Sequence, residues 1–187
     1  TTLFLVDSVN RDTTAYPQPT SFKLKLPRVY KDVKLVQITV SETFVNNVLA
    51  LRGVAECVKR SNKGGWQSDR CNQKTYPWAA EVVDAVQKVV GVDGDITYWY
   101  NINTGSDYNE WHDHDKGATD EMCGVFYLQV PENAGSFEYK IKKEIFQVKP
   151  YAGLLLLFPD DLMHRVLPND GDGERVSMAF NFWKMLK

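Results

Sequence analysis

Six short segments follow one another between residues 96 and 183, with no helical period between them. They are Ile96 to Ile102, Met122 to Val130, Ser136 to Tyr139, Glu144 to Val148, Gly153 to Phe158 and Arg175 to Trp183. Pro, Gly, Asn and Asp separate these segments, as they commonly separate strands that are joined by turns. This succession predicts a mainly β chain folded as an antiparallel sandwich or barrel, and it favours a jelly roll.

Two helices are predicted ahead of these strands. Within residues 42 to 60, the apolar residues Phe44, Val48, Leu51 and Ala55 recur at helical spacing, and Ser41 is a suitable N-cap. The second helix has Pro77 in its first turn and ends at Gly91, with an apolar stripe formed by Trp78, Val82, Ala85, Val86 and Val89. Both stripes predict helices that pack on the core.

Residues 1 to 40 are predicted to be an N-terminal extended segment or hairpin, attached to a jelly-roll domain at residues 41 to 187. Leu3 to Val6, Phe22 to Leu26 and Val33 to Val40 have strand patterns, and Tyr16 to Pro19 predicts a loop. The pattern from Asp7 to Pro27 resembles a short N-terminal segment found in proteins of large DNA viruses. An edge hairpin packed on the main domain is the alternative.

The charge, the cysteine content and the apolar runs of the sequence argue against some kinds of binding partner and compartment. The 22 basic and 24 acidic residues give a net charge of -2, which provides no broad positive field for nucleic acid. The three cysteines have no paired spacing, which favours a reducing compartment. The longest apolar run, Leu154 to Phe158, is too short to span a bilayer. We therefore expect a soluble cytoplasmic protein that does not bind membranes.

Histidines are scarce and two of them are almost adjacent. His112 and His114 are one residue apart, and the third histidine, His164, follows the most apolar predicted strand. If the stretch from Trp99 to Asp115 is a strand, His112 and His114 share one face, whereas Asp113 and Asp115 lie on the other. Two neighbouring imidazoles indicate a metal site, and a strand end suits a third ligand.

Arg175 begins the last predicted strand. In an extended run it shares a face with Ser177, Ala179 and Asn181, while the apolar residues of the run occupy the other face. An arginine and a serine inside a barrel are suited to binding a carboxylate. The alternative is a surface arginine in an ion pair with Glu174 or Asp172.

The order of several motifs resembles the 2-oxoglutarate and Fe(II)-dependent oxygenases. It runs Trp-x-Asn, Tyr-Asn-x-x-His-x-His, Gly-Val-Phe-Tyr-Leu-x-Val-Pro, Pro-x-x-Gly-x-Leu-x-x-Phe-Pro with a following His, and Glu-Arg-x-Ser-x-x-Phe-Asn. The resemblance covers residues 42 to 183 and is closest to members common in phages and marine bacteria. Those members also have the loop Ser-Asn-x-Gly-Gly-Trp-Gln-Ser, here residues 61 to 68. Trp66 and Trp111 are either packing residues or walls of the substrate opening.

The resemblance implies a double-stranded β-helix with Fe(II) at one mouth of the barrel. His112, His114 and His164 occupy the positions of the metal ligands. Most relatives have His-x-Asp where this chain has His-x-His, so the usual triad of two histidines and a carboxylate is changed. Three arrangements are open: His114 is the ligand, Asp113 or Asp115 ligates through a bulged strand, or Asp120 or Glu121 folds into the site. The strand geometry favours His114.

The resemblance also implies a cosubstrate site. Arg175 and Ser177 would bind the distal carboxylate of 2-oxoglutarate, and Tyr127 or Asn101 would add hydrogen bonds. The expected reaction couples oxidative decarboxylation of 2-oxoglutarate, with O2, to oxidation of a substrate, most simply its hydroxylation. A peptide or small molecule is favoured over nucleic acid as the substrate. The alternative function is a catalytically inactive jelly-roll protein that binds a ligand or is associated with a virion.

Overall fold

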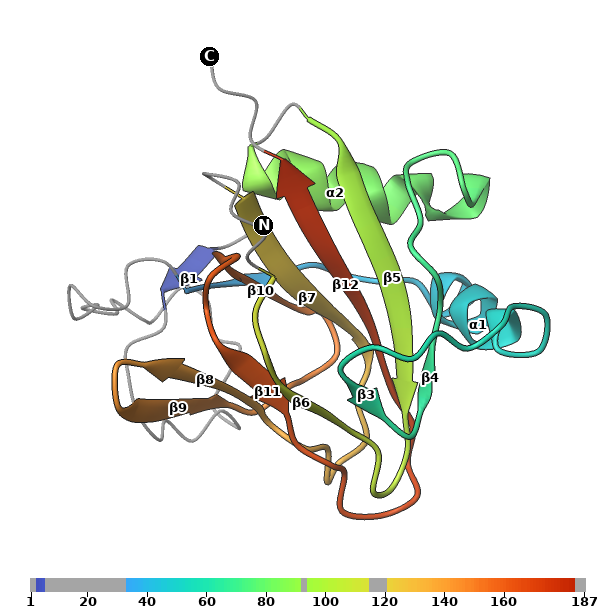
Figure 1. The fold of residues 1–187 in the computed structure, drawn as a ribbon. Helices are drawn as coiled ribbons and strands as arrows, with labels where there is room; N and C mark the ends of the chain where they lie inside the picture. The colour runs from blue at the N-terminus through green and yellow to red at the C-terminus, as the bar shows by residue number, and fades with distance from the viewer. Residues whose placement is uncertain (1–2, 6–32, 92–93, 115–120, 184–187) are drawn as a thin grey trace.

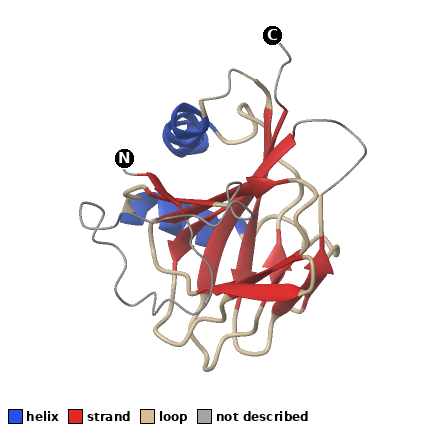
Figure 2. Cartoon of the chain, turned by 90° about the vertical axis from the view of Figure 1, so that its left-hand side faces the viewer, coloured by secondary structure: helices blue, strands red, loops and turns tan. Residues whose placement is uncertain are grey.

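A computed structural model of the chain describes residues 3–5, 33–91, 94–114 and 121–183. The predicted strand at residues 22 to 26 and the loop at residues 16 to 19 lie outside these ranges, as does the segment that resembles viral proteins. The described chain forms two facing antiparallel sheets with two helices on the outer side of one of them (Figures 1 and 2). The predicted mainly β jelly roll is confirmed.

The larger sheet forms the wall between the helices and the second sheet. Its strands, in spatial order, are β1 (Leu3–Leu5), β2 (Lys34–Gln37), β10 (Leu154–Pro159), β7 (Glu121–Gln129), β12 (Arg175–Trp183), β5 (Ile96–Asn103) and β4 (Trp66–Gln67). Strand β2 pairs with β10, so it belongs to the same sheet as the strands of the predicted jelly roll. The domain boundary predicted at residue 40 stays a prediction.

The smaller sheet closes the other side of the sandwich. Its strands, in spatial order, are β3 (Asn62–Lys63), β6 (Tyr108–His112), β11 (His164–Val166), β8 (Phe137–Ile141) and β9 (Glu144–Val148). Strand β11 was not among the predicted strands, because three residues are too few to show a period. It carries His164 and pairs with both β6 and β8.

The stretch from Trp99 to Asp115 is not a single strand, contrary to the prediction. Strand β5 ends at Asn103, and the backbone N–H and hydroxyl of Thr104 donate to Asp107 at 2.9 and 3.2 Å in the turn that follows. The chain then continues as β6 in the other sheet. After this turn the chain belongs to the smaller sheet, and His112 is the last residue of β6.

The helices cover the outer face of the larger sheet. Helix α1 (Glu42–Leu51) has the predicted N-cap, since the Ser41 hydroxyl accepts a hydrogen bond from the backbone N–H of Phe44 at 3.2 Å. It ends nine residues before the predicted limit of residue 60, because turns follow Leu51 and the carbonyl of Ala55 accepts a hydrogen bond from the Trp66 indole instead. Trp66 therefore packs in the core.

The second predicted helix is confirmed in a slightly different form. Residues Pro77–Ala79 form a single 3₁₀ turn, and helix α2 (Ala80–Val90) follows directly. Gly91 has a φ of 71° and ends the helix in the left-handed region, where glycine avoids a side-chain clash. Among the described residues, no helix combines the length and the apolar character needed to cross a membrane.

Two apolar clusters lie on opposite faces of the larger sheet. Alternate residues of β10 divide between them: Leu155 and Leu157 belong to the cluster beneath the helices, and Leu154, Leu156 and Phe158 to the cluster between the sheets. All five side chains are buried because both faces of this strand are covered. The continuous apolar run in the sequence is explained by this double coverage.

The close packing of the larger sheet gives a stability prediction at Gly124 in β7. A Cβ atom at this position would lie 2.1 Å from Phe180 Cζ and 2.6 Å from the carbonyl oxygen of Leu156. We expect Gly124→Ala to lower the free energy of unfolding by about 2–3 kcal/mol, measured by urea denaturation. Gly53→Ala is the control, since its nearest neighbour is 3.6 Å away. Equal stability of the two variants would contradict the packing described.

Candidate active site

Three histidines, two of them in strands of the smaller sheet, lie close together. His112 ends β6 and lies opposite His164, the first residue of β11, in the antiparallel pairing. His114 follows two residues after His112, and its backbone N–H donates to the carbonyl of Asp160 at 2.8 Å. The ring centroids are 4.2 Å apart for His112 and His164, 5.1 Å for His114 and His164, and 5.4 Å for His112 and His114. Ligand nitrogens of the three rings lie within 4.8 Å of one another.

Hydrogen bonds orient each ring. The Nδ1 atoms of His112 and His164 lie 2.6 and 2.7 Å from the carbonyl oxygens of Glu110 and Leu162. The Nδ1 atom of His114 lies 2.8 Å from Asn181 Oδ1. Because these oxygens only accept hydrogen bonds, Nδ1 of each ring carries the proton and Nε2 keeps its lone pair. This is the arrangement in which histidines ligate a metal through Nε2.

Burial keeps the three imidazoles neutral. It lowers the pKa of His112, lowers that of His114 to about 4, and lowers that of His164 well below its usual value. Each ring also lies beside other imidazoles, whose charge would oppose a further proton on His114 or His164. Neutral imidazole is the form that binds metals, so the ligand set is ready at neutral pH.

The cluster contains no carboxylate among the described residues. Asp113 is exposed and is not part of the group of ligand atoms. Asp115 and Asp120 lie outside the described residues, as does the side chain of Glu121. The structure thus brings together His112, His114 and His164, and the three-imidazole set fits a divalent transition metal.

A cavity of about 290 Å³ extends from the histidines between the two sheets. Its lining includes all seven residues that the sequence singled out, namely Asn101, His112, His114, Tyr127, His164, Arg175 and Ser177. Ala179 and Asn181 line it too, which confirms the predicted polar face of the last strand. The cavity therefore joins a metal-ligand cluster to a buried cation.

Arg175 is the largest buried polar residue of this cavity, with 1% of its surface exposed. Its Nη1 atom donates to the carbonyl oxygens of Gly135 and Leu167 at 2.8 and 2.9 Å and to Asn169 Oδ1 at 3.0 Å. The neighbouring Glu174 pairs with Arg52. The alternative of a surface ion pair between Arg175 and Glu174 is therefore wrong.

Two buried donors in this part of the cavity, one of them on Arg175 itself, have no hydrogen-bond partner among the described residues. They are Arg175 Nη2 and the Tyr127 hydroxyl. Burial raises the pKa of Tyr127 to about 12, so the phenol keeps its proton, and the charge of Arg175 opposes this shift. Burial lowers the pKa of Arg175, but a guanidinium stays protonated in proteins. With the nearby Ser177 hydroxyl, these donors fit a carboxylate.

The structure adds residues that the sequence reasoning did not single out. Cys123 lies beneath His114, with its Sγ atom 3.1 Å from Nδ1 of that ring and 3.3 Å from Asn181 Oδ1. Asn169 orients Arg175 from a loop and therefore has no strand pattern to mark it. Trp111 is absent from the lining of the cavity, and Lys140 Nζ and Arg165 Cζ lie 3.9 and 4.7 Å from its ring centroid.

The low pKa of His114 predicts how pH changes the stability of the metal-free protein. Its pKa is about 4 when folded and 6.5 ordinarily, so the unfolded state binds more protons between these values and stability falls as the pH falls. His114→Asn removes this proton uptake and keeps a donor toward Asn181. Between pH 7 and pH 5, we expect the wild type to lose about 1–2 kcal/mol more unfolding free energy than this variant. If urea denaturation shows that the two proteins lose the same unfolding free energy, His114 is not buried in its neutral form.

Comparisons with known proteins identify similar sequences and folds. Residues 97–181 match the model of a family described as "Putative 2OG-Fe(II) oxygenase". No curated protein sequence matches the chain.

Three solved structures illustrate the similarity of the fold. A viral collagen prolyl hydroxylase from Paramecium Bursaria Chlorella virus-1, in complex with 2-oxoglutarate, is 13% identical, with 81% of this chain and 95% of that chain covered and a TM-score of 0.58. A prolyl hydroxylase from Trichoplax adhaerens, bound to a peptide fragment of hypoxia inducible factor, is 10% identical, with coverages of 82% and 84% and a TM-score of 0.62. HygX from Streptomyces hygroscopicus, with nickel and 2-oxoglutarate bound, is 14% identical, with coverages of 83% and 84% and a TM-score of 0.57. The chain therefore has the fold of the 2-oxoglutarate and Fe(II)-dependent oxygenases.

Proposed function

We propose that the chain is an Fe(II)- and 2-oxoglutarate-dependent oxygenase that hydroxylates a small molecule or a peptide side chain. The observation that carries the proposal is that a cluster of three neutral histidines and a buried arginine with an unpaired Nη2 atom line one cavity. A metal site alone fits many proteins. The added carboxylate site, in a fold shared with enzymes that bind 2-oxoglutarate, favours this reaction class.

Each residue has a distinct role in this proposal. His112, His114 and His164 hold Fe(II) through Nε2, and their Nδ1 hydrogen bonds fix the direction of the rings. Bound iron supplies the O2 chemistry that decarboxylates 2-oxoglutarate to succinate and CO2 and oxidises the substrate.

The cosubstrate is oriented by residues at the other end of the cavity. Arg175 Nη2, the Tyr127 hydroxyl and the Ser177 hydroxyl bind its distal carboxylate. Asn101 lies opposite Ser177 in the pairing of β5 with β12 and adds a polar side chain to the same wall. These contacts leave the keto acid end of the molecule directed toward the histidines.

The inactive binding protein is the second candidate. The observation that favours it is the replacement of the usual carboxylate ligand by His114, which leaves three imidazoles among the described ligand residues. Such a site also suits zinc, which supports no redox chemistry. Turnover therefore distinguishes the two candidates, whereas metal binding alone does not.

The first test follows the formation of the complex and then turnover. We expect Fe(II) and 2-oxoglutarate together, without O2, to give a visible charge-transfer absorption that neither gives alone, because the keto acid chelates the metal. Admitting O2 should then convert 2-oxoglutarate to succinate. A folded protein that binds both without forming succinate would support the binding protein, and one that binds neither would refute both metal-centred readings.

A second prediction separates the cosubstrate site from the metal site. Arg175→Lys keeps a positive charge but loses the two-sided geometry of the guanidinium, so 2-oxoglutarate affinity should fall at least about 100-fold. Metal affinity should stay within about twofold, because Arg175 makes no contact with the histidines among its hydrogen bonds. Calorimetric titration measures both values.

Tyr127→Phe provides a milder variant without a folding penalty. The hydroxyl has no partner among the described residues, so its removal should leave the unfolding free energy unchanged or slightly higher. We expect 2-oxoglutarate affinity to fall about fivefold. Unchanged affinity in both Tyr127→Phe and Arg175→Lys would place the cosubstrate elsewhere.

A further inference from the structure

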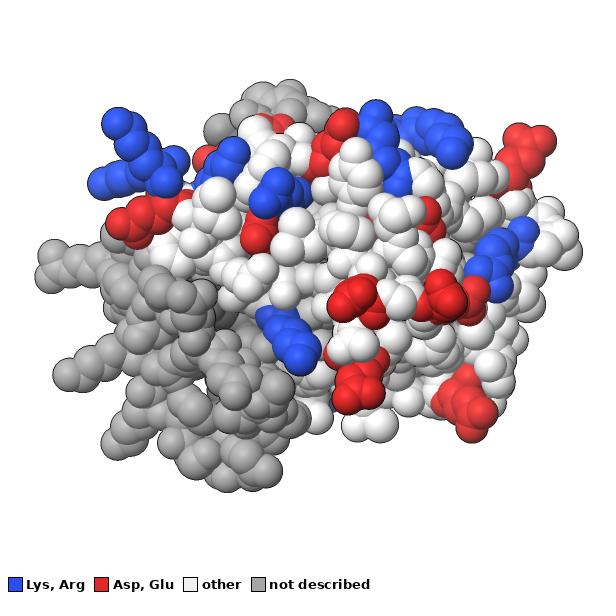
Figure 3. Space-filling view, turned by 90° about the horizontal axis from the view of Figure 1, so that it is seen from below, with Lys and Arg blue, Asp and Glu red and all other residues white. Residues whose placement is uncertain are grey.

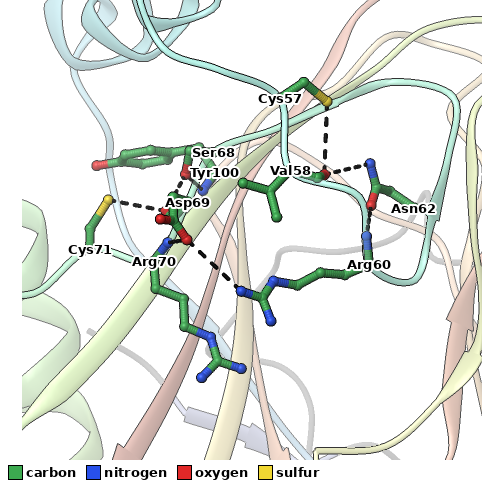
Figure 4. Close-up of polar contacts among 9 residues, drawn as sticks. All are labelled: Cys57, Val58, Arg60, Asn62, Ser68, Asp69, Arg70, Cys71 and Tyr100. Carbon is green, nitrogen blue, oxygen red and sulfur yellow. Dashed lines mark hydrogen bonds and ion pairs between the residues drawn. The ribbon is translucent and has the colours of Figure 1, made fainter.

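Two more arginines line the cavity on its exposed side. Arg60 and Arg70 are both exposed, in contrast to the buried Arg175, so they form part of the mouth. They flank the short strands β3 and β4, one on each side, and Figure 4 shows both side chains extending from this segment into the same region. A pair of cations at the mouth is not needed for metal or cosubstrate binding.

The backbone of Arg60 is fixed close to the histidines. Its N–H donates to Asn62 Oδ1 at 2.7 Å, and Asn62 pairs with Asn109 of β6. The next residue, Ser61, has its hydroxyl 3.5 Å from His112 Nε2 and accepts a hydrogen bond from the Asn109 amide at 3.2 Å. Arg60 is therefore the residue directly before Ser61, whose side chain contacts the histidine cluster.

The backbone of Arg70 is fixed in the same way by β5. The N–H of Ser68 donates to the carbonyl of Tyr100 at 3.0 Å, and the N–H of Tyr100 donates to the Ser68 hydroxyl at 2.9 Å. Cys71, the residue after Arg70, forms an antiparallel β-bridge with Tyr98 through backbone hydrogen bonds. Arg70 and His114 both line the cavity.

Neither guanidinium is neutralised by a close partner. Arg60 Nη2 lies 3.9 Å from Asp69 Oδ1, in a pair whose side chains are 45% and 80% exposed. An exposed contact at this distance contributes little. The same Asp69 oxygen already accepts a hydrogen bond from the backbone N–H of Arg70 at 2.7 Å. The Arg70 guanidinium has no hydrogen-bond or ion-pair partner within the described ranges.

The charged groups of the site, with Fe(II) and 2-oxoglutarate bound, sum to a net positive charge. Three arginines and one aspartate, Asp113, are the charged residues among the described lining. The two charges of Fe(II) are balanced by the two carboxylates of 2-oxoglutarate, and the three imidazoles contribute no negative charge. An aspartate ligand would have removed one positive charge. Arg175 is buried at the cosubstrate end, so Arg60 and Arg70 exceed Asp113 by one positive charge at the mouth, where a substrate must approach.

We infer that the substrate of the proposed oxygenase is a small organic anion, whose carboxylate or phosphate group is bound by Arg60 and Arg70 at the mouth of the cavity. This inference rests on the proposed function. Guanidinium groups bind both kinds of oxyanion through paired hydrogen bonds. The anionic group anchors the molecule while its oxidised carbon reaches toward the histidines.

The distribution of charge does not favour a polyanion as the substrate. On the face shown in Figure 3, lysine and arginine side chains are interspersed with aspartate and glutamate. The chain as a whole carries a net charge of -2. A nucleic acid needs a continuous basic surface, whereas a small anion needs only two correctly placed arginines.

Calorimetric titration of the protein saturated with Ni(II) and 2-oxoglutarate tests this inference. Inorganic phosphate and acetate are the anionic probes, and acetamide is the neutral one. We expect one of the anions to bind and acetamide not to bind, and the stronger anion identifies the group that is recognised. Arg60→Gln and Arg70→Gln should each weaken anion binding about fivefold, and the double variant more than about tenfold.

Lys59→Gln and Lys74→Gln are matched controls. Both remove one positive charge from an exposed residue of the same segment, and neither residue lines the cavity. Their anion affinity should stay within about twofold of the wild type. Equal loss in controls and arginine variants, or no anion binding to the loaded wild type, would overturn the inference.

The same titrations keep the two proposals separate. Their first stage records the binding of Ni(II) and 2-oxoglutarate, before any anion is added. Failure of that stage in the wild type counts against the oxygenase itself. An intact first stage without anion binding rejects only the anionic substrate.

Discussion

Strand β12 lies between β5 and β7 and carries different chemistry on its two faces. Val176, Met178, Phe180 and Phe182 belong to the cluster beneath the helices, while alternate residues line the cavity. Eight residue pairs with β5 fix its register. A slip by one residue would place these four apolar side chains in the cavity and Arg175 in the apolar core. The core and the candidate site are therefore determined by the same pairing.

Burial of charge is the second constraint on this site. An isolated buried cation costs several kcal/mol, and the three acceptors of Arg175 Nη1 offset only part of this. The Nη2 atom and the Tyr127 hydroxyl are buried without a hydrogen-bond partner among the described residues. A bound carboxylate would give both of them an acceptor. The histidines avoid a similar cost because burial holds them neutral.

Much of this architecture could be predicted from the sequence, because strand alternation and helix spacing are local properties. The face of Arg175, Ser177 and Asn181 and the N-cap at Ser41 were predicted in this way and are confirmed. Strand β11 was missed because three residues show no period. Trp66 and Trp111 could not be assigned, since what covers an aromatic side chain depends on segments that are distant in the sequence.

The site was harder to predict because it depends on contacts between sheets. Alternation favoured His114 over Asp113, but that these residues meet His164 depends on the chain crossing to β6 and on the pairing of His112 with His164. Arg60 and Arg70 lie on either side of a glycine-containing turn, where exposed arginines are common and have no distinctive pattern. Their importance becomes visible only when the cavity they line is known.

We propose that three imidazoles hold the metal while Arg175 holds 2-oxoglutarate. A crystal structure of the protein loaded with Fe(II) and 2-oxoglutarate under anaerobic conditions tests it most directly. We expect the metal to be bound to Nε2 of His112, His114 and His164, with the distal carboxylate on Arg175 Nη2. A metal ligated by a carboxylate of the chain in place of His114, or a cosubstrate bound away from Arg175, would contradict it.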